Sequence, residues 1–495
     1  MCGLGLGGAL GGRVAPKLSP EHALKAYALL ELVVALTAVL IAPLLALLAP
    51  VFAWAYGEDG SISMFFLVRV ACAFAVLLVP TIGLGATFPI AVRVMVGSPT
   101  RLGAPTGRLY GANTGGAAIG SMAAGFVLIP VLGLRGTLLI GVVGSAASIA
   151  LALSIDRSSL PDPVPAAMSA KPRVKGRDRA GRKPDVGKVA RPQYGLAAAV
   201  LALTGFATFV HEVVWTRVLA MVVGPSIFAF TATLTSFITG LALGSFAGAA
   251  LAERRRHTAM TLALTLVATA AASCVSLAFV GSSVVELGPG DAGHANVAGV
   301  PLPLLAIAFG LTLPIALGLG VAFPLSLELA GSDDAIPARR LGVLYAVNTA
   351  GAVIGALVAG FVAIPTIGLR ASLLVGTTAL VVGALALIVR GARSNRSRIA
   401  ALVTVSAVVA WMATSAGWDR EWLAAGGYLY SRFVPTGVDR RAALTAGTLL
   451  YYREGATGTV SVRTLTGQRS LAIDGKVDAS TARDMIGPPR SRWSD

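Results

Sequence analysis

The sequence predicts an all-α polytopic membrane protein, in which two repeated helical bundles are followed by a short β-meander. Three observations indicate this fold class. First, 55% of the 495 residues are hydrophobic and only 13% are charged, against roughly 25% charged residues in soluble domains. Second, apolar segments long enough to cross a bilayer follow one another along the chain. Third, a long stretch of the first half recurs in the second half.

The charge is strongly basic but is placed as in a membrane protein. The formal net charge is +17, and the Lys and Arg residues fall mainly between the apolar segments. That placement is typical of cytoplasmic loops and argues against a nucleic-acid partner. The three cysteines, Cys2, Cys72 and Cys274, share no close spacing. They therefore form neither a disulfide framework nor a metal site.

About eleven apolar segments are long enough for spans, since a helix needs about 20 mainly apolar residues to cross the hydrocarbon core. They cover residues 24–50, 64–96, 107–130, 134–153, 195–223, 226–251, 258–281, 302–329, 341–364, 370–389 and 399–417. Residues 1–13 look like the end of another, partial span. We therefore expect a first bundle over 1–153 that is N-terminally incomplete.

The basic residues predict the orientation of the spans. Arg13, Arg93, Arg254, Arg340 and Arg390 all lie in alternate loops, whereas the loops at 57–61 and 281–300 contain no Lys or Arg. Positively charged loops stay in the cytoplasm. We expect a multi-pass protein of the inner (plasma) membrane, with the lipid bilayer as its partner.

The longest polar interruption, residues 154–193, divides the chain into two parts. It contains nine basic residues between Lys171 and Arg191, together with several prolines and glycines. Such a composition cannot bury a core, so we expect a disordered cytoplasmic linker. A contact with anionic lipid is an additional role that this charge would suit.

The two parts are copies of one unit. Residues 82–89 recur at 317–324 and residues 109–135 recur at 344–370, both with a shift of 235 residues. The second copy, expected over 194–390, also contains a segment at 205–224 that has no counterpart in the first copy. Two six-helix halves joined by a basic cytoplasmic loop resemble the architecture of a major-facilitator-type transporter.

Five polar residues inside the predicted spans are candidate site residues, because polar and ionisable groups are costly in a bilayer. They are His211, Glu212, Arg217, Asn113 and Asn348. Two interpretations are open for each: a proton or ligand site, or an interhelical hydrogen bond that fixes packing. Glu212 and Arg217 are five residues apart and cannot share one narrow helix face. The glycines around Asn113 and Asn348 predict close helix packing.

Near the C-terminus the long apolar segments end and an alternating pattern of polar and apolar residues begins. Residues 391–417 predict an extra span or an interfacial helix, and the alternating pattern at 449–485 predicts a β-hairpin or meander. If 399–417 crosses the membrane, the segment at 418–485 lies outside the cytoplasm.

This C-terminal segment resembles the small N-terminal β-domain of spermidine synthases. The residues that carry the resemblance are Asp474, Gly475, Asp478, Thr481 and Asp484. The membrane part resembles the bundle of bacterial fused major-facilitator/spermidine-synthase proteins, through EVVWTR at 212–217, GLALGS at 240–245 and the two LYxxNTxG helices.

The resemblance implies a polyamine-biosynthesis function, the transfer of an aminopropyl group from decarboxylated S-adenosylmethionine to a diamine. In that family a downstream nucleotide-binding domain performs the reaction, and nothing after Trp418 matches it; residues 486–495 match nothing in the family. We therefore expect a chain truncated at both ends, without catalytic residues or bound cofactor, and inactive alone. The alternative function is a major-facilitator-type transporter of polyamines or related cations. The sequence does not predict an oligomeric state.

Overall fold

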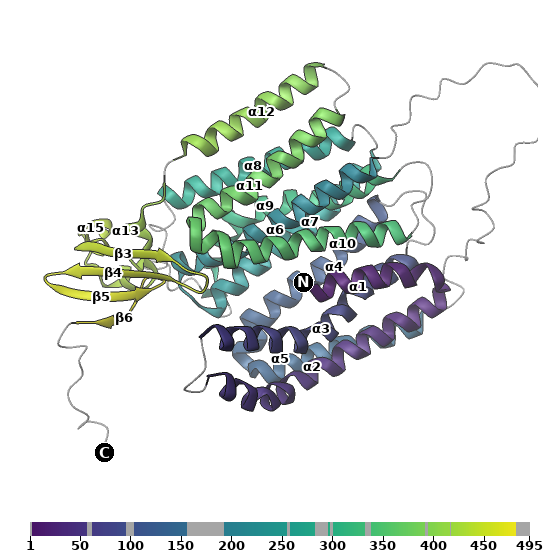
Figure 1. The fold of residues 1–495 in the computed structure, drawn as a ribbon, viewed down its shortest axis with the longest axis horizontal. Helices are drawn as coiled ribbons and strands as arrows, with labels where there is room; N and C mark the ends of the chain where they lie inside the picture. The colour runs from purple at the N-terminus through teal and green to yellow at the C-terminus, as the bar shows by residue number, and fades with distance from the viewer. Residues whose placement is uncertain are drawn as a thin grey trace, which may run out of the picture.

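The structure, a computed structural model, is built almost entirely from long helices (Figure 1). It describes residues 2–56, 62–95, 103–155, 193–254, 258–282, 296–297, 300–331, 338–391, 395–415 and 417–481. Most of the predicted linker and all of residues 486–495 lie outside these ranges. Within them, eight helical segments are long and apolar enough to cross a membrane. The prediction of a mostly helical membrane protein is confirmed at this level.

Five helices form the first half of the bundle. They are α1 (Cys2–Val14), α2 (Pro20–Tyr56), α3 (Ile62–Met95), α4 (Gly103–Ala123) and α5 (Ile129–Ser154). A π-helical turn, Ala124–Leu128, connects α4 to α5. The helical path then breaks at Gly133, whose φ of 69° suits a residue without a Cβ.

Seven long helices follow residue 193 in the described part of the chain. They are α6 (Tyr194–Val223), α7 (Ile227–Glu253), α8 (Thr258–Ser282), α9 (Leu302–Ala330), α10 (Ala338–Leu357), α11 (Ile364–Gly391) and α12 (Asn395–Thr414). A π-helical turn, Val358–Ala363, connects α10 to α11, and a break at Gly368 (φ 84°) follows it. Both α10 and α11 pack against α6. The chain therefore reverses direction near this break.

The eight apolar segments and the eleven predicted spans differ chiefly at these breaks. Two of the eight segments, Gly103–Ser154 and Arg340–Arg390, have double length and each contain two predicted spans. The predicted segment 399–417 corresponds to α12, a shorter apolar helix that packs against α8 and α11. Residues 2–14 form α1, which packs against α3 and α10.

Helix contacts follow the 235-residue repeat, in which α1 to α5 correspond to α7 to α11. Within the halves, α1 packs on α3 as α7 packs on α9, and α2 packs on α5 as α8 packs on α11. Between the halves, α4 packs on α7, and its counterpart α10 packs on α1. Helix α6 has no counterpart among the described helices.

Two glycine pairs show what α6 adds to the second half. A Cβ at Gly351 would lie 2.2 Å from the Ala202 carbonyl oxygen of α6, and one at Gly355 would lie 2.3 Å from that of Phe206. A Cβ added at the counterparts in α4, Gly116 and Gly120, would meet no described atom of another helix within 4 Å. The same glycine face is therefore covered by α6 in one half and uncovered by described residues in the other.

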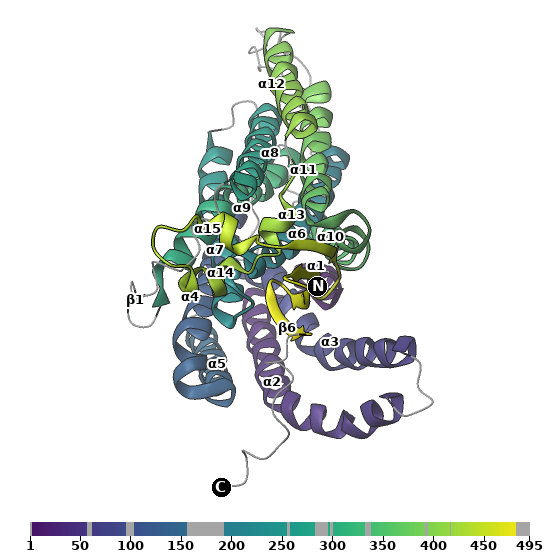
Figure 2. The same cartoon turned by 90° about the vertical axis from the view of Figure 1, so that its left-hand side faces the viewer.

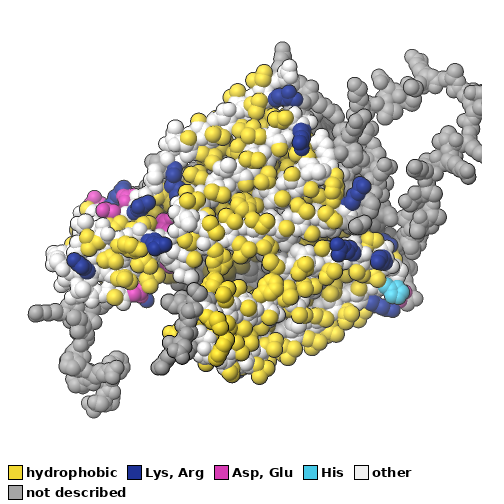
Figure 3. Space-filling model, in the orientation of Figure 1, with side chains coloured by type: hydrophobic (Ala, Val, Ile, Leu, Met, Phe, Trp, Pro, Cys, Tyr) yellow, Lys and Arg dark blue, Asp and Glu magenta, His cyan; other side chains and the backbone are white. Residues whose placement is uncertain are grey.

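The two ends of the bundle differ in charge. The last turns of α3 and α11 and the first turns of α10 and α12 carry arginines at the end where the linker joins, which we call the basic end: Arg93, Arg340, Arg390 and Arg398. Hydrophobic side chains cover the flank of the helices in Figure 3, and Lys and Arg lie on the right, at this end, and on the left, over the β unit. An apolar flank with charged side chains confined to its ends is typical of a bundle that spans a bilayer.

The opposite end of the bundle holds a β unit formed by residues 417–481 (Figures 1 and 2). Its antiparallel meander is β3 (Thr448–Glu454), β4 (Thr459–Leu465), β5 (Gln468–Ile473) and β6 (Lys476–Ser480), in the order of the chain. Asp474 and Gly475, with φ of 48° and 83°, form the tight turn between β5 and β6. Three short helices, α13 (Arg420–Leu423), α14 (Gly427–Tyr430) and α15 (Arg440–Leu444), precede the sheet. The predicted meander is confirmed.

Candidate functional site

The candidate site is a cavity of about 280 Å³ between the two halves of the bundle. Most of its lining comes from α6, α7, α9 and α10, and α1 and α4 of the first half contribute Leu4 and Tyr110. Its polar lining consists of Glu212, Asn348, two tyrosines and three threonines: Tyr110, Tyr345, Thr204, Thr208 and Thr349.

Helix α6 supplies the carboxylate. Thr204, Thr208 and Glu212 follow one another at intervals of four residues, which places them on one face of the helix. The Thr208 hydroxyl donates to the Thr204 carbonyl at 2.7 Å. A threonine hydroxyl can thus donate its hydrogen bond to a backbone carbonyl of its own helix. The Glu212 carboxylate has no such partner on α6.

The Glu212 carboxylate is half-buried and has neither a hydrogen bond nor an ion pair within the described part of the chain. Asn348 of α10 lines the same cavity. The two helices approach closely here, since a Cβ at Gly205 would lie 2.1 Å from the Asn348 carbonyl oxygen. An unpaired carboxylate in apolar surroundings is costly. It is therefore available to a proton or to a cation that enters the cavity.

His211, the neighbour of Glu212 in sequence, lies on another face of α6 and is buried inside the second half. Its Nδ1 donates to the Ala207 carbonyl oxygen at 2.8 Å, and its Nε2 lies 3.0 Å from the Ser273 hydroxyl of α8. Ser273 in turn lies 2.9 Å from the Thr377 hydroxyl of α11. This geometry is an interhelical hydrogen-bond network joining α6, α8 and α11, away from the cavity.

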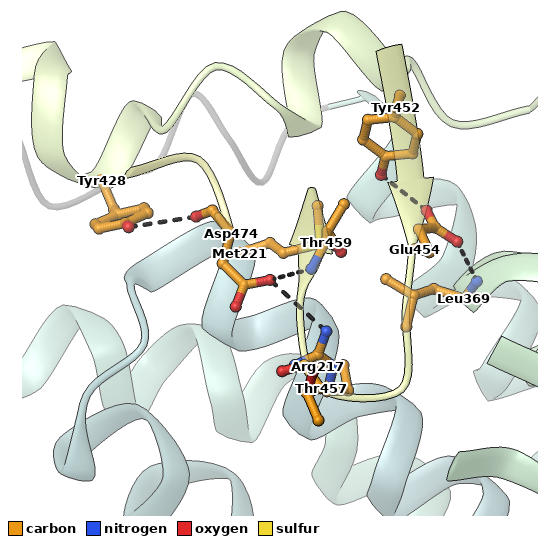
Figure 4. Close-up of polar contacts among 9 residues, drawn as sticks. All are labelled: Arg217, Met221, Leu369, Tyr428, Tyr452, Glu454, Thr457, Thr459 and Asp474. Carbon is orange, nitrogen blue, oxygen red and sulfur yellow. Dashed lines mark hydrogen bonds and ion pairs between the residues drawn. The ribbon is translucent and has the colours of Figure 1, made fainter. Parts of the chain in front are cut away.

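Arg217 likewise does not line the cavity, and its side chain contacts the β unit (Figure 4). Its guanidinium lies 3.7 Å from the Asp474 carboxylate and donates to the Thr457 carbonyl oxygen. Asp474 itself is buried and accepts a hydrogen bond from the Thr459 amide at 2.8 Å. The pair therefore attaches the β5–β6 turn and the β3–β4 loop to α6.

Glu454 of β3 makes a second attachment. Its carboxylate accepts hydrogen bonds from the Leu369 amide, next to the break at Gly368, and from the Tyr452 hydroxyl at 2.8 Å (Figure 4). Burial raises the pKa of Tyr452, and the nearby Glu454 carboxylate raises it further. Burial likewise raises the pKa of Tyr428, which contacts the Asp474 carbonyl oxygen, to about 12. Both phenols are thus held in the neutral form that donates these bonds.

The remaining predicted residues do not converge on a site. Asp478 is exposed and lies 3.7 Å from the Lys476 ammonium. Thr481, at the edge of the sheet, accepts from the Arg469 amide at 2.9 Å. Gly475 packs against Gly426 in the turn. Asn113 is exposed on α4, outside the cavity, and Asp484 lies outside the described residues.

A larger groove, of about 410 Å³, lies where α11 meets the β unit. Its charged groups are mostly engaged with the protein: Arg370 donates to Ser415 at 2.6 and 2.7 Å, and Glu454 is bonded as above. No group of three or more His, Cys, Asp or Glu side chains that could hold a metal occurs in the described ranges. The cavity between the halves is therefore the better candidate for a solute site.

Glu212 and Asn348 were predicted from the sequence as candidate site residues, whereas the aromatic and hydroxyl side chains of the lining were not. Tyr110 and Tyr345 are counterparts in the 235-residue repeat, and both line the cavity. Their equivalence was a signal that could have placed them near the axis that relates the two halves.

No family model matches this chain, and no curated protein matches it. Among solved structures, the chain is similar to the major facilitator superfamily transporter FucP in the outward conformation, with 18% identity over 79% of this chain and 89% of that chain, and a TM-score of 0.47. A second structure, the E. coli fucose:proton symporter FucP, gives 17% identity over 79% and 90%, also with a TM-score of 0.47. The similarity is distant. The class that the fold itself defines is a multi-pass helical membrane protein with a small C-terminal β unit.

Proposed function

We propose that this chain is a transporter of the major-facilitator type that moves a small organic cation through the cavity between its two halves. The observation that carries the proposal is the Glu212 carboxylate, which faces this cavity without a partner among the described residues. A negative charge in a mainly apolar site favours a positively charged solute or a proton.

The volume of the cavity and the side chains that line it indicate which solutes fit. A cavity of about 280 Å³ lies just below the range of small-molecule sites, roughly 300–1,000 Å³, and therefore fits a small solute. Asn348 and the tyrosine hydroxyls add hydrogen-bonding groups, and the aromatic faces attract ammonium groups. Short polyamines and related cations combine these features, so they are the solutes we would test first.

The placement of the β unit favours transport over aminopropyl transfer. The β unit lies at the end of the bundle opposite the basic end. Under the positive-inside rule that side is outside the cytoplasm, away from decarboxylated S-adenosylmethionine. Asp474 is already engaged with Arg217 and Thr459. Membership of the spermidine-synthase-like fusion family stays a prediction from the sequence.

Uptake by proteoliposomes tests the proposal. Purified protein should take up labelled putrescine or spermidine above empty liposomes, and Glu212→Gln should abolish uptake, because the amide keeps the shape but carries no charge. Glu31→Gln is the matched control: Glu31 is another carboxylate within a span, accepts from the Ser145 hydroxyl at 3.0 Å, and does not line the cavity. This variant should keep most of the uptake.

Two results would refute the proposal. One is the absence of uptake for a panel of small cations by folded protein, as judged by a single size-exclusion peak. The other is unchanged uptake by Glu212→Gln, which would show that the carboxylate in the cavity is not used.

A further inference from the structure

Four aromatic side chains lie together where the two halves meet, on the side of the cavity nearer the basic end. They are Phe88 of α3, Tyr110 of α4, Phe323 of α9 and Tyr345 of α10. The repeat relates Phe88 to Phe323 and Tyr110 to Tyr345, each by 235 residues. We call these four rings the aromatic cluster.

The rings contact one another in a closed circuit that crosses between the halves twice. Within the halves, Phe88 lies 5.7 Å from Tyr110 and Phe323 lies 6.5 Å from Tyr345, as ring centroids. Between the halves, Phe88 lies 5.4 Å from Tyr345 and Tyr110 lies 4.7 Å from Phe323. Such distances are those of favourable aromatic pairs.

The order of residues along three helices shows that this cluster closes one side of the cavity. On α6 the cavity lining starts at Thr204, and Leu201, about one turn nearer the basic end, is fully buried. On α9 the lining ends at Phe323, and Leu327 follows, fully buried. On α10 the lining starts at Tyr345, directly after the fully buried Leu344.

These leucines belong to one buried apolar cluster with Phe88 and Phe323, and Tyr110 and Tyr345 pack against it. It is separate from the main core of the second half. A solute in the cavity thus meets three of the four rings first and then a layer of buried leucines before the basic end. Polar solutes cannot cross such a layer without its opening.

We propose that the aromatic cluster is a gate that closes the cavity toward the basic end, and that the two halves must separate there to open it. Opening breaks the two ring pairs that join the halves and keeps the two pairs within them. The ion pair between Arg108 of α4 and Glu253 of α7 also joins the halves near this end. Because both side chains are about half exposed, this pair contributes less than the rings do.

Thiol labelling tests the gate without any knowledge of the solute. Thr208→Cys places a thiol in the cavity, in a chain whose Cys2, Cys72 and Cys274 are replaced by Ala. A membrane-impermeant maleimide is applied to vesicles whose basic end faces the bath. Labelling should be slow. Adding Phe88→Ala with Phe323→Ala should accelerate it at least about tenfold, because the two changes remove a ring from all four pairs.

The matched control is Phe126→Ala. Phe126 also pairs with a ring across the halves, Phe228 of α7 at 5.9 Å, but it precedes α5 at the end opposite the basic end. This change should leave labelling from the basic end unaltered. If the double alanine variant does not fold, the pair Phe88→Leu and Phe323→Leu keeps apolar volume without rings and should label at an intermediate rate.

Rapid labelling of the parent Thr208→Cys chain from the basic end would overturn the proposal, as would double variants that label no faster than the parent. Because labelling does not require transport, loss of the gate and failure of the proposed transport function give separate results.

Discussion

Neighbouring residues of helix α6 have three different surroundings. Glu212 faces the cavity, His211 bonds to α8, and Arg217 pairs with the β unit. Helical geometry predicts the separation of Glu212 and Arg217, since five residues turn the helix by about 500° and leave them about 140° apart. The partners could not be predicted, because Ser273 and Asp474 are distant in sequence and only the tertiary fold brings them to α6.

The Arg217–Asp474 pair should stabilise the attachment of the β unit. Its side chains are only 16% and 10% exposed, so removal of one leaves the other charge buried. We expect Arg217→Ala to lower the free energy of unfolding by about 2 kcal/mol, less than the ~3–5 kcal/mol of fully buried pairs, because the charges are 3.7 Å apart and retain some exposure. Thermal unfolding in detergent, with limited proteolysis of residues 417–481, measures this effect.

Arg469→Ala is the control for that substitution, because Arg469 is exposed on β5 and only its backbone makes a described hydrogen bond. It should change stability by less than about 0.5 kcal/mol. Equal effects of the two substitutions would mean that the pair does not hold the β unit to α6.

At the scale of elements, the repeat identified equivalent helices but not their different neighbours. Glycine spacing in both α4 and α10 predicted close packing. In α10 this packing exists, against α6, whereas Gly116 and Gly120 of α4 have no described neighbour within 4 Å. Sequence similarity between the copies could not show this difference, since it lies in the partner helix and not in the glycine helix itself.

The repeat also supplies a test with its own control. Gly351→Ala should destabilise the protein by about 1–3 kcal/mol, as overpacking does, because the new Cβ would lie 2.2 Å from a backbone oxygen. Gly116→Ala, at the counterpart position, should be neutral or stabilising by up to about 1 kcal/mol, since Ala favours helix over Gly. Thermal unfolding of both variants in the same detergent gives the comparison. Equal destabilisation of the two would contradict the packing of α6 on α10.

At the scale of the molecule, hydropathy predicted the membrane class and the alternation of the C-terminal segment predicted the meander, because both patterns are local. The basic residues of the loops predicted which helix ends lie together, and Arg93, Arg340, Arg390 and Arg398 do lie at the ends of α3, α10, α11 and α12 that form the basic end. Docking of the β unit onto α6 and α11 was not predictable, since it depends on single contacts of Arg217 and Glu454 with distant residues.

The proposed transport requires that the two halves move against each other around the cavity to carry a solute. Arg108 and Glu253 form an ion pair between α4 and α7 at the basic end, so a cysteine at each position allows the halves to be joined there. With the native cysteines replaced, a cleavable bifunctional thiol reagent should abolish cation uptake by the Arg108→Cys/Glu253→Cys protein. Reductive cleavage of the reagent should restore uptake, and the single-cysteine proteins should be unaffected. Full uptake by protein that is shown on a gel of proteolysed samples to be cross-linked would mean that transport does not need the halves to separate at the basic end.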